Sequence, residues 1–185
     1  TVRAMSDVTV RPIRLDGSLR WSMDGIFAGI DRGITALAAE SLTSLGVDTW
    51  GCDYGLVDEY GALVEPPYHY RDRRTDGVMD RVLARLGRDR VYGTTGIQCL
   101  PFNTLYQLAA DERDGALAAA DQALLIPDLV SYWLTGTAVT ERTNASTTGL
   151  LGIDGRWDDE LMERLGIPAG LFPAVVDPGT DLGPI

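Results

Sequence analysis

The segment VDTWGCDYGLVDEYG, residues 47–61, is the most informative part of this 185-residue chain. Its apolar residues are typical of a buried strand, but polar residues and two glycines, Gly51 and Gly55, interrupt them. A glycine lets a ligand or another backbone approach closely. A carboxylate accepts hydrogen bonds from hydroxyls, and an indole covers a C–H face. Trp50, Gly51 and Asp53 therefore indicate a site for a polyhydroxylated ligand, and a β-bulge with a turn-capping Asp and a core Trp is the alternative.

A second candidate segment is GIQCLPFNTLYQL, residues 96–108. Phe102 and Asn103 follow Pro101, just before the apolar pattern of a helix. An aromatic wall and an amide at a helix N-terminus are suited to a small-molecule pocket. The alternative is structural, with a hydrophobic staple and Asn103 as the helix N-cap.

The third segment, YHYRDRRT at residues 68–75, concentrates arginines around Asp72 and contains His69, the only histidine. The arginines are suited to binding an anion, but an ion pair between Arg71 and Asp72 that fixes the loop is the simpler interpretation. His69 lies between two tyrosines and after two prolines. We interpret it as a packed loop residue and not as a catalyst.

The composition excludes several classes of function. All 16 basic residues are arginine, against 27 acidic residues and a net charge of −11. Nucleic acid and anionic membranes are therefore not expected as partners. The lack of lysine excludes a Walker-A or Schiff-base lysine, and a single histidine excludes a multi-histidine metal site. Two cysteines without a CxxC pattern, no apolar run of about 18 residues and no signal-peptide pattern favour a cytoplasmic protein.

The periodicity predicts an α/β protein. Strands are expected over residues 7–13, around 45–47 and over 54–57, with turns at 15–18 and 59–61. Helices are expected from Ser22 to about Glu40, from Thr75 to Leu86, from Asn103 or Thr104 onward, after Pro127, and over 158–166. These helices have cap residues or glycine stops at their ends.

Taken together and in this order, five segments resemble the FGGY family of carbohydrate kinases. They are residues 47–61, YRDRRTDGVM (70–79), residues 95–108, LLIPDLVSYWLTG (124–136) and TNASTTGLL (143–151). The resemblance covers roughly residues 12–185 and implies a ribonuclease-H-like mixed sheet with helices, of the actin/hexokinase/Hsp70 ATPase class. It implies ATP-dependent phosphorylation of the 1-hydroxyl of a sugar, with Mg²⁺. DTWG followed by Asp53, and LPFNT, point to the L-rhamnulose branch; an L-fuculose or L-xylulose kinase and a non-catalytic sugar-binding module are the alternatives.

The resemblance also implies which parts of such a kinase the chain contains. Residues 1–185 are expected to form an N-terminal sugar-binding domain that lacks the phosphate-binding first hairpin, the catalytic Asp segment and the C-terminal nucleotide domain. We therefore assign no catalytic, cofactor-binding or metal-binding residue and expect the chain alone to be inactive. An unpaired sheet edge near residues 45–57 is expected to favour self-association.

The same resemblance implies sugar contacts. Gly51 matches a position where the backbone meets the substrate. Trp50 and Cys52 fall where related kinases place sugar-contacting side chains, and Phe102 matches an aromatic residue that touches a polyol. Asp53 and Asn103 are added to the substrate-binding set from their chemistry alone.

Overall fold

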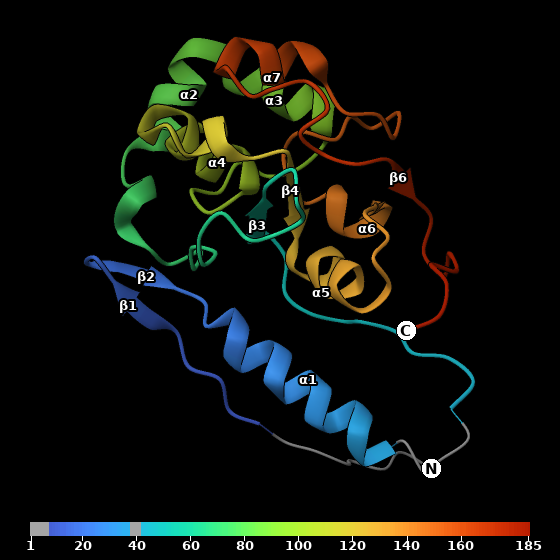
Figure 1. Cartoon of the computed structure of the whole chain (residues 1–185). Helices are drawn as coiled ribbons and strands as arrows, with labels where there is room; N and C mark the ends of the chain where they lie inside the picture. The colour runs from blue at the N-terminus through green and yellow to red at the C-terminus, as the bar shows by residue number, and fades with distance from the viewer. Residues whose placement is uncertain (1–7, 38–41) are drawn as a thin grey trace.

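A computed structural model describes residues 8–37 and 42–185 (Figure 1). It begins with an antiparallel hairpin of β1 (Ile13–Leu15) and β2 (Ser18–Arg20), which turns at Asp16 and Gly17. The strand expected over residues 7–13 therefore starts only at its last residue. Pro12 offers no N–H to a neighbouring strand, and Val8 and Val10 lie beside Gly29 and Gly25 of the following helix instead.

The first helix, α1 (Met23–Leu37), starts directly after Ser22, as expected. Only Met23 is buried, and the helix lies with the hairpin on one side of the molecule (Figure 1). Its Phe27 stacks on Trp133 with ring centroids 4.7 Å apart. Its expected end near Glu40 lies outside the described residues. Residues 42–50 form an irregular segment, so the strand expected around residues 45–47 is not observed.

The centre is an antiparallel pair of β3 (Tyr54–Val57) and β4 (Gln122–Leu125), in which Tyr54 lies opposite Leu125. After β3 the chain turns at residues 59–61 as expected, because the Asp58 N–H donates to the Ala62 carbonyl at 2.9 Å. A third pair, β5 (Thr140–Glu141) and β6 (Val175–Val176), is parallel. Parallel and antiparallel pairing combined with helices confirms the α/β class.

Most expected helices are present, with changed boundaries. The segments are η1 (Arg73–Thr75), α2 (Val78–Leu86), α3 (Arg88–Thr95), α4 (Thr104–Asp114), η2 (Ala116–Ala119), α5 (Ile126–Thr135), α6 (Arg142–Ala145) and α7 (Asp159–Leu165). Thr75 does not cap α2: it ends η1, and Gly77, with a φ of +70°, separates the two helices. The sequence reasoning missed α3, because only Val91 and Thr95 of this polar helix are buried.

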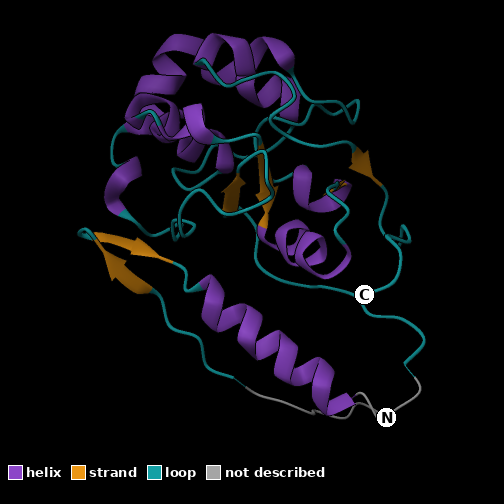
Figure 2. Cartoon of the chain, viewed as in Figure 1, coloured by secondary structure: helices purple, strands orange, loops and turns teal. Residues whose placement is uncertain are grey.

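The core lies on both sides of the β3–β4 pair. Figure 2 shows these two strands between the groups of helices. Helices α2, α3, α4 and α7 gather on one side, and α5 and α6 lie on the other (Figure 1). Successive β4 side chains point in opposite directions: Ala123 and Leu125 join the larger cluster, whereas Leu124 joins the cluster with Ile126 and Leu129. This alternation is the period-two pattern of a strand buried on both faces. Among the described helices, none is long and apolar enough to cross a membrane.

Candidate functional site

Asp53, the residue immediately before β3, is the centre of the candidate site. Its Oδ2 accepts hydrogen bonds from the Trp21 and Trp50 indole N–H groups at 2.6 and 3.0 Å, and from the Tyr70 backbone N–H at 3.2 Å. Its Oδ1 accepts one from Gln107 at 3.1 Å. Burial raises the pKa of this fully buried carboxyl, and the donated hydrogen bonds oppose the rise. Asp53 thus fixes two tryptophans and two loops with respect to one another.

Five rings form a continuous aromatic row beside Asp53. Trp50 contacts Trp21 with ring centroids 4.3 Å apart, and Trp21 stacks on His69 at the same separation. His69 stacks on Tyr70 at 4.6 Å, and Tyr70 meets the edge of Phe102 at 5.9 Å. Aromatic walls with few polar groups are typical of small-molecule sites. The row joins Trp50 and Phe102, the two aromatic residues that the sequence proposed as sugar contacts.

His69 is a packed member of this row, in agreement with the interpretation from the sequence. The residue is 5% exposed, and burial lowers the pKa of its imidazole. Its Nδ1 accepts a hydrogen bond from the Arg71 N–H at 3.1 Å, which leaves the proton of the neutral ring on Nε2. The ring therefore acts as a neutral aromatic surface near pH 7.

Cys52 has an unusual backbone conformation next to the site. Its φ is +77°, a left-handed value that costs a residue with a side chain on the order of 1–2 kcal/mol. Its carbonyl accepts hydrogen bonds from the Thr104 hydroxyl at 2.9 Å and from Gln107 at 3.1 Å, and both hold the strained turn. Burial, followed by the charge of Asp53, raises the pKa of the Cys52 thiol to about 11. The thiol is therefore protonated and uncharged near pH 7, and it does not act as a nucleophile.

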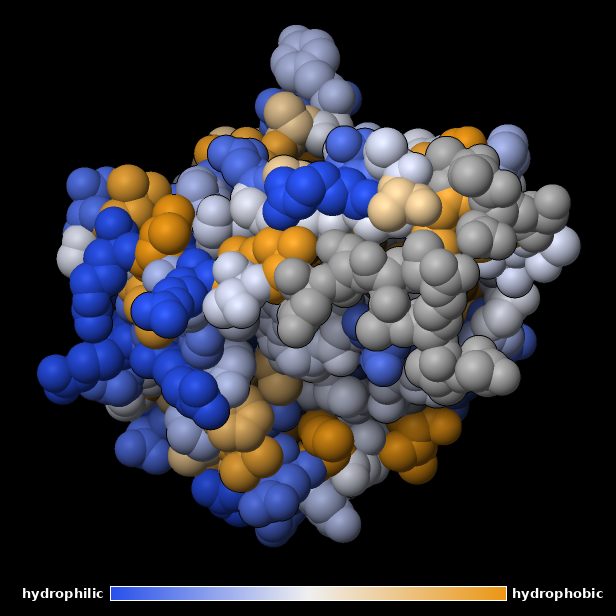
Figure 3. Space-filling view, turned by 90° about the horizontal axis from the view of Figure 1, so that it is seen from below, coloured by the Kyte–Doolittle hydropathy of each residue, from blue (hydrophilic) through white to orange (hydrophobic). Residues whose placement is uncertain are grey.

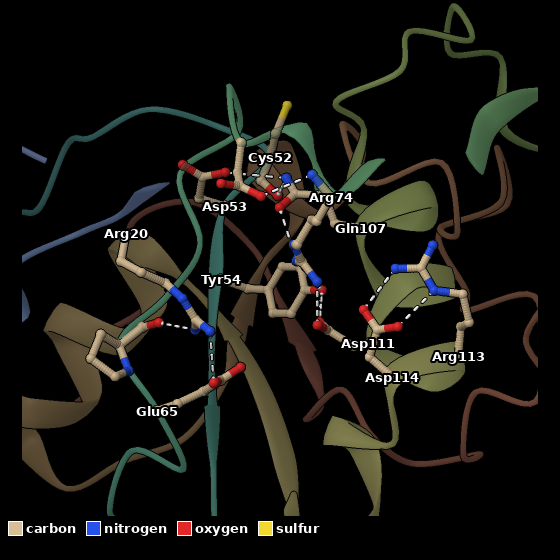
Figure 4. Close-up of polar contacts among 12 residues, drawn as sticks. Arg20, Cys52, Asp53, Tyr54, Glu65, Arg74, Gln107, Asp111, Arg113 and Asp114 are labelled. Atoms are coloured by element: carbon tan, nitrogen blue, oxygen red, sulfur yellow. Dashed lines mark hydrogen bonds and ion pairs between the residues drawn. The ribbon is translucent and has the colours of Figure 1, made fainter. Parts of the chain in front are cut away.

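Gln107 joins the two candidate segments (Figure 4). From α4, its Nε2 lies 3.1 Å from each of three acceptors: the Cys52 carbonyl, Asp53 Oδ1 and the Phe102 carbonyl. Its Oε1 accepts a hydrogen bond from Arg74 at 3.3 Å. One amide thus connects residues 52–53, the turn before α4 and the arginine-rich turn.

Gly51 faces the loop that follows α6. A Cβ built on Gly51 would lie 3.4 Å from Thr147 Oγ1 and 3.5 Å from Asn144 Oδ1. The Asn144 side-chain N–H₂ is buried without a hydrogen-bond partner. Asn103 is tied to the same loop, since its Nδ2 donates to the Thr147 carbonyl at 3.2 Å and its Oδ1 accepts from Leu100 N–H at 2.7 Å. Asn103 therefore braces the backbone on both sides.

Arg74 connects the site to Asp111 and Tyr54 (Figure 4). Its guanidinium pairs with buried Asp111 of α4 and lies 3.5 Å from the Tyr54 hydroxyl, which itself donates to Asp111. The Arg74 guanidinium carbon also lies 3.7 Å from the Tyr68 ring centroid. This network fixes the arginine-rich turn to α4 and to β3.

The structure brings most of the six proposed contact residues together. Trp50, Cys52, Asp53 and Phe102 converge on Gln107 or the aromatic row, and Gly51 and Asn103 lie against the Thr147 loop. The sequence reasoning missed Trp21, Tyr70, Gln107 and Asn144 as members of the site. Gln107 had a readable signal, since it is a polar residue in the apolar stretch that opens α4.

The fold and the site define a class of protein. Residues 10–185 match the family model described as FGGY family of carbohydrate kinases, N-terminal domain. The chain belongs to this family, which confirms the resemblance in the sequence and its ribonuclease-H-like fold.

The curated relatives include rhamnulokinases. The chain is 44% identical over 188 residues to the rhamnulokinase of Yersinia pestis bv. Antiqua (strain Angola), covering 99% of this chain and 39% of that protein. It is 46% identical over 173 residues to the rhamnulokinase of Pectobacterium atrosepticum, covering 91% of this chain and 35% of that protein. The chain thus spans about two fifths of the length of these relatives.

Solved structures share the fold. A gluconate kinase from Lactobacillus acidophilus superposes with a TM-score of 0.81 at 20% identity, over 95% of this chain and 37% of that one. A carbohydrate kinase from Novosphingobium aromaticivorans gives a TM-score of 0.81 at 24% identity, over 94% of this chain and 37% of that one.

Proposed function

We propose that this chain forms the sugar-binding part of an ATP-dependent kinase that phosphorylates the 1-hydroxyl of L-rhamnulose. The observation that carries the proposal is the aromatic row, which is held by Asp53 and lies beside Gly51. The rhamnulokinase relatives, at 44–46% identity, support the choice of sugar.

The described residues are suited to binding and orientation. The ring faces of Trp50 and Phe102 would cover the C–H groups of the sugar. Gly51, which has no side chain, would let the sugar approach the protein backbone. The Asn144 N–H₂ group near Gly51 is buried and has no hydrogen-bond partner among the described residues. Holding a hydroxyl within about 1 Å of its reacting position is worth roughly 100-fold in rate. Asp53 contributes indirectly, because its acceptor positions are already used by four N–H groups.

ATP and Mg²⁺ enter the proposal through the family alone. Within residues 8–37 and 42–185, no group of three or more His, Cys, Asp or Glu side chains is arranged to hold a metal ion. In phosphoryl transfer, positioning and electrostatic stabilisation do most of the work, and these residues would supply the positioning.

The specificity has alternatives within the family. Related ketoses such as L-fuculose and L-xylulose differ from L-rhamnulose in chemical details that single contacts can discriminate. A non-catalytic sugar-binding module would keep the aromatic row and transfer no phosphate.

A chimaeric kinase tests the proposal. This chain would replace the matching segment of the Yersinia pestis rhamnulokinase, and ATP-dependent phosphorylation of the three ketoses would be measured. We expect L-rhamnulose to give the highest kcat/KM. A folded chimaera that binds L-rhamnulose without turnover would favour the binding module, and preference for another ketose would reassign the substrate.

Two further properties remain predictions. A cytoplasmic location rests on the two cysteines, Cys52 and Cys99, which are both free thiols. Self-association was expected through a sheet edge near residues 45–57. In the structure β3 is paired with β4 on one side and contacts Leu63 and Val64 on the other, so β3 itself is not an unpaired edge. Sedimentation at several concentrations tests whether the chain self-associates.

A further inference from the structure

The β1–β2 hairpin and the arginine-rich turn enclose a hollow of about 280 Å³. Arg14, Ser18, Arg71, Asp72, Arg73 and Arg74 are among its lining residues. The hollow is firmly built, because the His69 N–H donates to the Leu19 carbonyl at 3.0 Å and the Leu19 N–H donates to Asp72 Oδ2 at 2.6 Å. Strongly hydrophilic side chains gather at the left of the face seen from below, on the side of the hairpin (Figure 3).

The charges in this hollow are unbalanced. Among the described residues that line it, Asp72 alone is acidic, and both of its oxygens accept backbone N–H groups, from Leu19 at 2.6 Å and Arg74 at 2.8 Å. Arg74 is committed to Asp111, and Arg73 pairs with Asp76 at 3.0 Å.

Two further guanidinium groups line the hollow, those of Arg14 and Arg71. Within the described part of the chain, Arg14 and Arg71 form no ion pair: Arg14 reaches only the Gly17 carbonyl, at 3.3 Å, and Arg71 lies over the Tyr70 ring, 4.8 Å from its centroid. Both residues are exposed. In a chain of net charge −11, a local group of arginines with no acidic partner among the described residues attracts an anion.

We propose that this hollow binds a phosphate group, either inorganic phosphate or a short phosphomonoester. The guanidinium fork matches phosphate oxygens in a bidentate geometry, and the Ser18 hydroxyl adds a neutral donor. The volume of about 280 Å³ lies just below the range of small-molecule pockets, which begins at about 300 Å³, and suits a ligand as small as phosphate. The inference does not depend on the proposed kinase function, since the phosphate is titrated without sugar or ATP.

Isothermal titration of the chain with inorganic phosphate tests the site. We expect one phosphate per chain, with binding that weakens as chloride rises from about 20 to 200 mM, because salt screens exposed charges. The double variant Arg14→Ala/Arg71→Ala should bind at least about tenfold more weakly, since one hydrogen bond to a charged group is worth roughly 1.5–3 kcal/mol. The control is Arg32→Ala, an exposed arginine of α1, which should bind like the wild type.

Circular dichroism melts establish that each variant is folded; if the double variant is not, Arg14→Gln and Arg71→Gln replace it, each with an expected loss of about three- to fivefold. A parallel titration with glycerol phosphate distinguishes the sources of the phosphate. Tighter binding than inorganic phosphate assigns a phosphomonoester, and equal or weaker binding assigns the free anion. The proposal is overturned if phosphate produces no binding signal up to millimolar concentrations, or if the arginine variants bind as tightly as Arg32→Ala.

Discussion

At the scale of single residues, Asp53 organises the site without a free acceptor of its own. Trp21 lies 32 positions before it and Gln107 lies 54 positions after it, and both reach its carboxylate. Replacing a buried carboxylate with this many partners lowers the free energy of unfolding far more than replacing an exposed carboxylate.

Replacing Asp53 with Asn should destabilise the protein. An amide N–H₂ would face N–H donors from Trp21, Trp50 or Gln107, so at least one buried donor would lose its acceptor. We expect the free energy of unfolding to fall by about 2–3 kcal/mol, with a shift in tryptophan emission. Urea denaturation measures the change, and Asp31→Asn on the exposed face of α1 is the matched control. Equal stabilities for both variants would contradict the assigned role.

Gly51 and Gly55 form a natural pair for a second prediction. The added methyl of Gly51→Ala meets only ordinary contacts of 3.4 and 3.5 Å, whereas that of Gly55→Ala would lie 2.7 Å from Leu63 and 2.8 Å from Leu129. We expect Gly51→Ala to melt like the wild type and Gly55→Ala to lose about 1–3 kcal/mol by overpacking. A large loss of stability for Gly51→Ala would instead favour a structural bulge at this position.

Sequence reasoning could point to part of the candidate site, because Trp50, Gly51 and Asp53 stand together in an interrupted strand, whereas Cys52 entered through the family resemblance alone. It could not find Trp21 or Tyr70, because their membership depends on a hairpin and a loop folding onto Asp53 from distant positions. Asn103 occupies the N-cap position that the sequence offered as its alternative role, but its side chain makes no capping hydrogen bond and turns to Leu100 and Thr147 instead.

At the scale of elements, one ion pair ties η1 to α4. Arg74 and Asp111 are both nearly buried, and their network includes the Tyr54 hydroxyl of β3. Removing one partner of a buried pair leaves an uncompensated charge.

Asp111→Ala should therefore lower the free energy of unfolding by about 3–5 kcal/mol. Its control is Asp114→Ala in the exposed pair with Arg113 on the same helix, for which we expect less than about 1 kcal/mol. Guanidinium denaturation at pH 7 compares the two. A similar cost for both variants would mean that burial does not set the strength of the Arg74 pair.

The start of α5 should make stability depend on pH. Burial raises the pKa of Asp128 to about 7, and the charge of Glu141 adds to the rise, although the Glu141 N–H donates to Asp128 Oδ1 at 3.1 Å. The folded state then holds a proton that the unfolded state, with a pKa near 3.9, has released. Stability therefore falls as pH rises from about 4 to 7, by up to roughly 4 kcal/mol from this group.

Asp128→Asn is the neutral counterpart that tests this effect. We expect the wild type and the variant to be similarly stable near pH 4 and the variant to be the more stable at pH 8, in urea denaturation at both pH values. A stability difference that does not change between the two pH values would show that folding does not raise the pKa of Asp128.

The sequence predicted the elements that carry strong local signals. Helix α5 follows from Pro127 in its first turn, and α7 from Asp158 at its start and Gly166 at its end. It failed where tertiary contacts decide: α3 is polar and is held by two buried residues, and residues 8–10 alternate like a strand but lie along α1.

At the scale of the whole molecule, two apolar clusters support the β3–β4 pair, and the candidate site lies at the start of β3. Trp21 and Trp50 also line a hollow of about 440 Å³, whose other walls include α1. The two indoles therefore border open space on the side of α1, whereas Gly51 and Phe102 are not among the residues that line this hollow. The ribonuclease-H-like fold itself followed from the resemblance of five ordered segments, since no periodicity in the sequence specifies how short strands pair over long separations.

The central claim is that the residues around Gly51 and the aromatic row hold a ketose. Titration of the chain with L-rhamnulose, followed by calorimetry and tryptophan fluorescence, tests it most directly. The account predicts a dissociation constant between about 1 µM and 1 mM, in the range of ordinary enzyme substrates, and a loss of at least about tenfold for Gly51→Ala with an unchanged melting temperature. Absence of binding to the folded wild-type chain, or equal binding by Gly51→Ala, would contradict it.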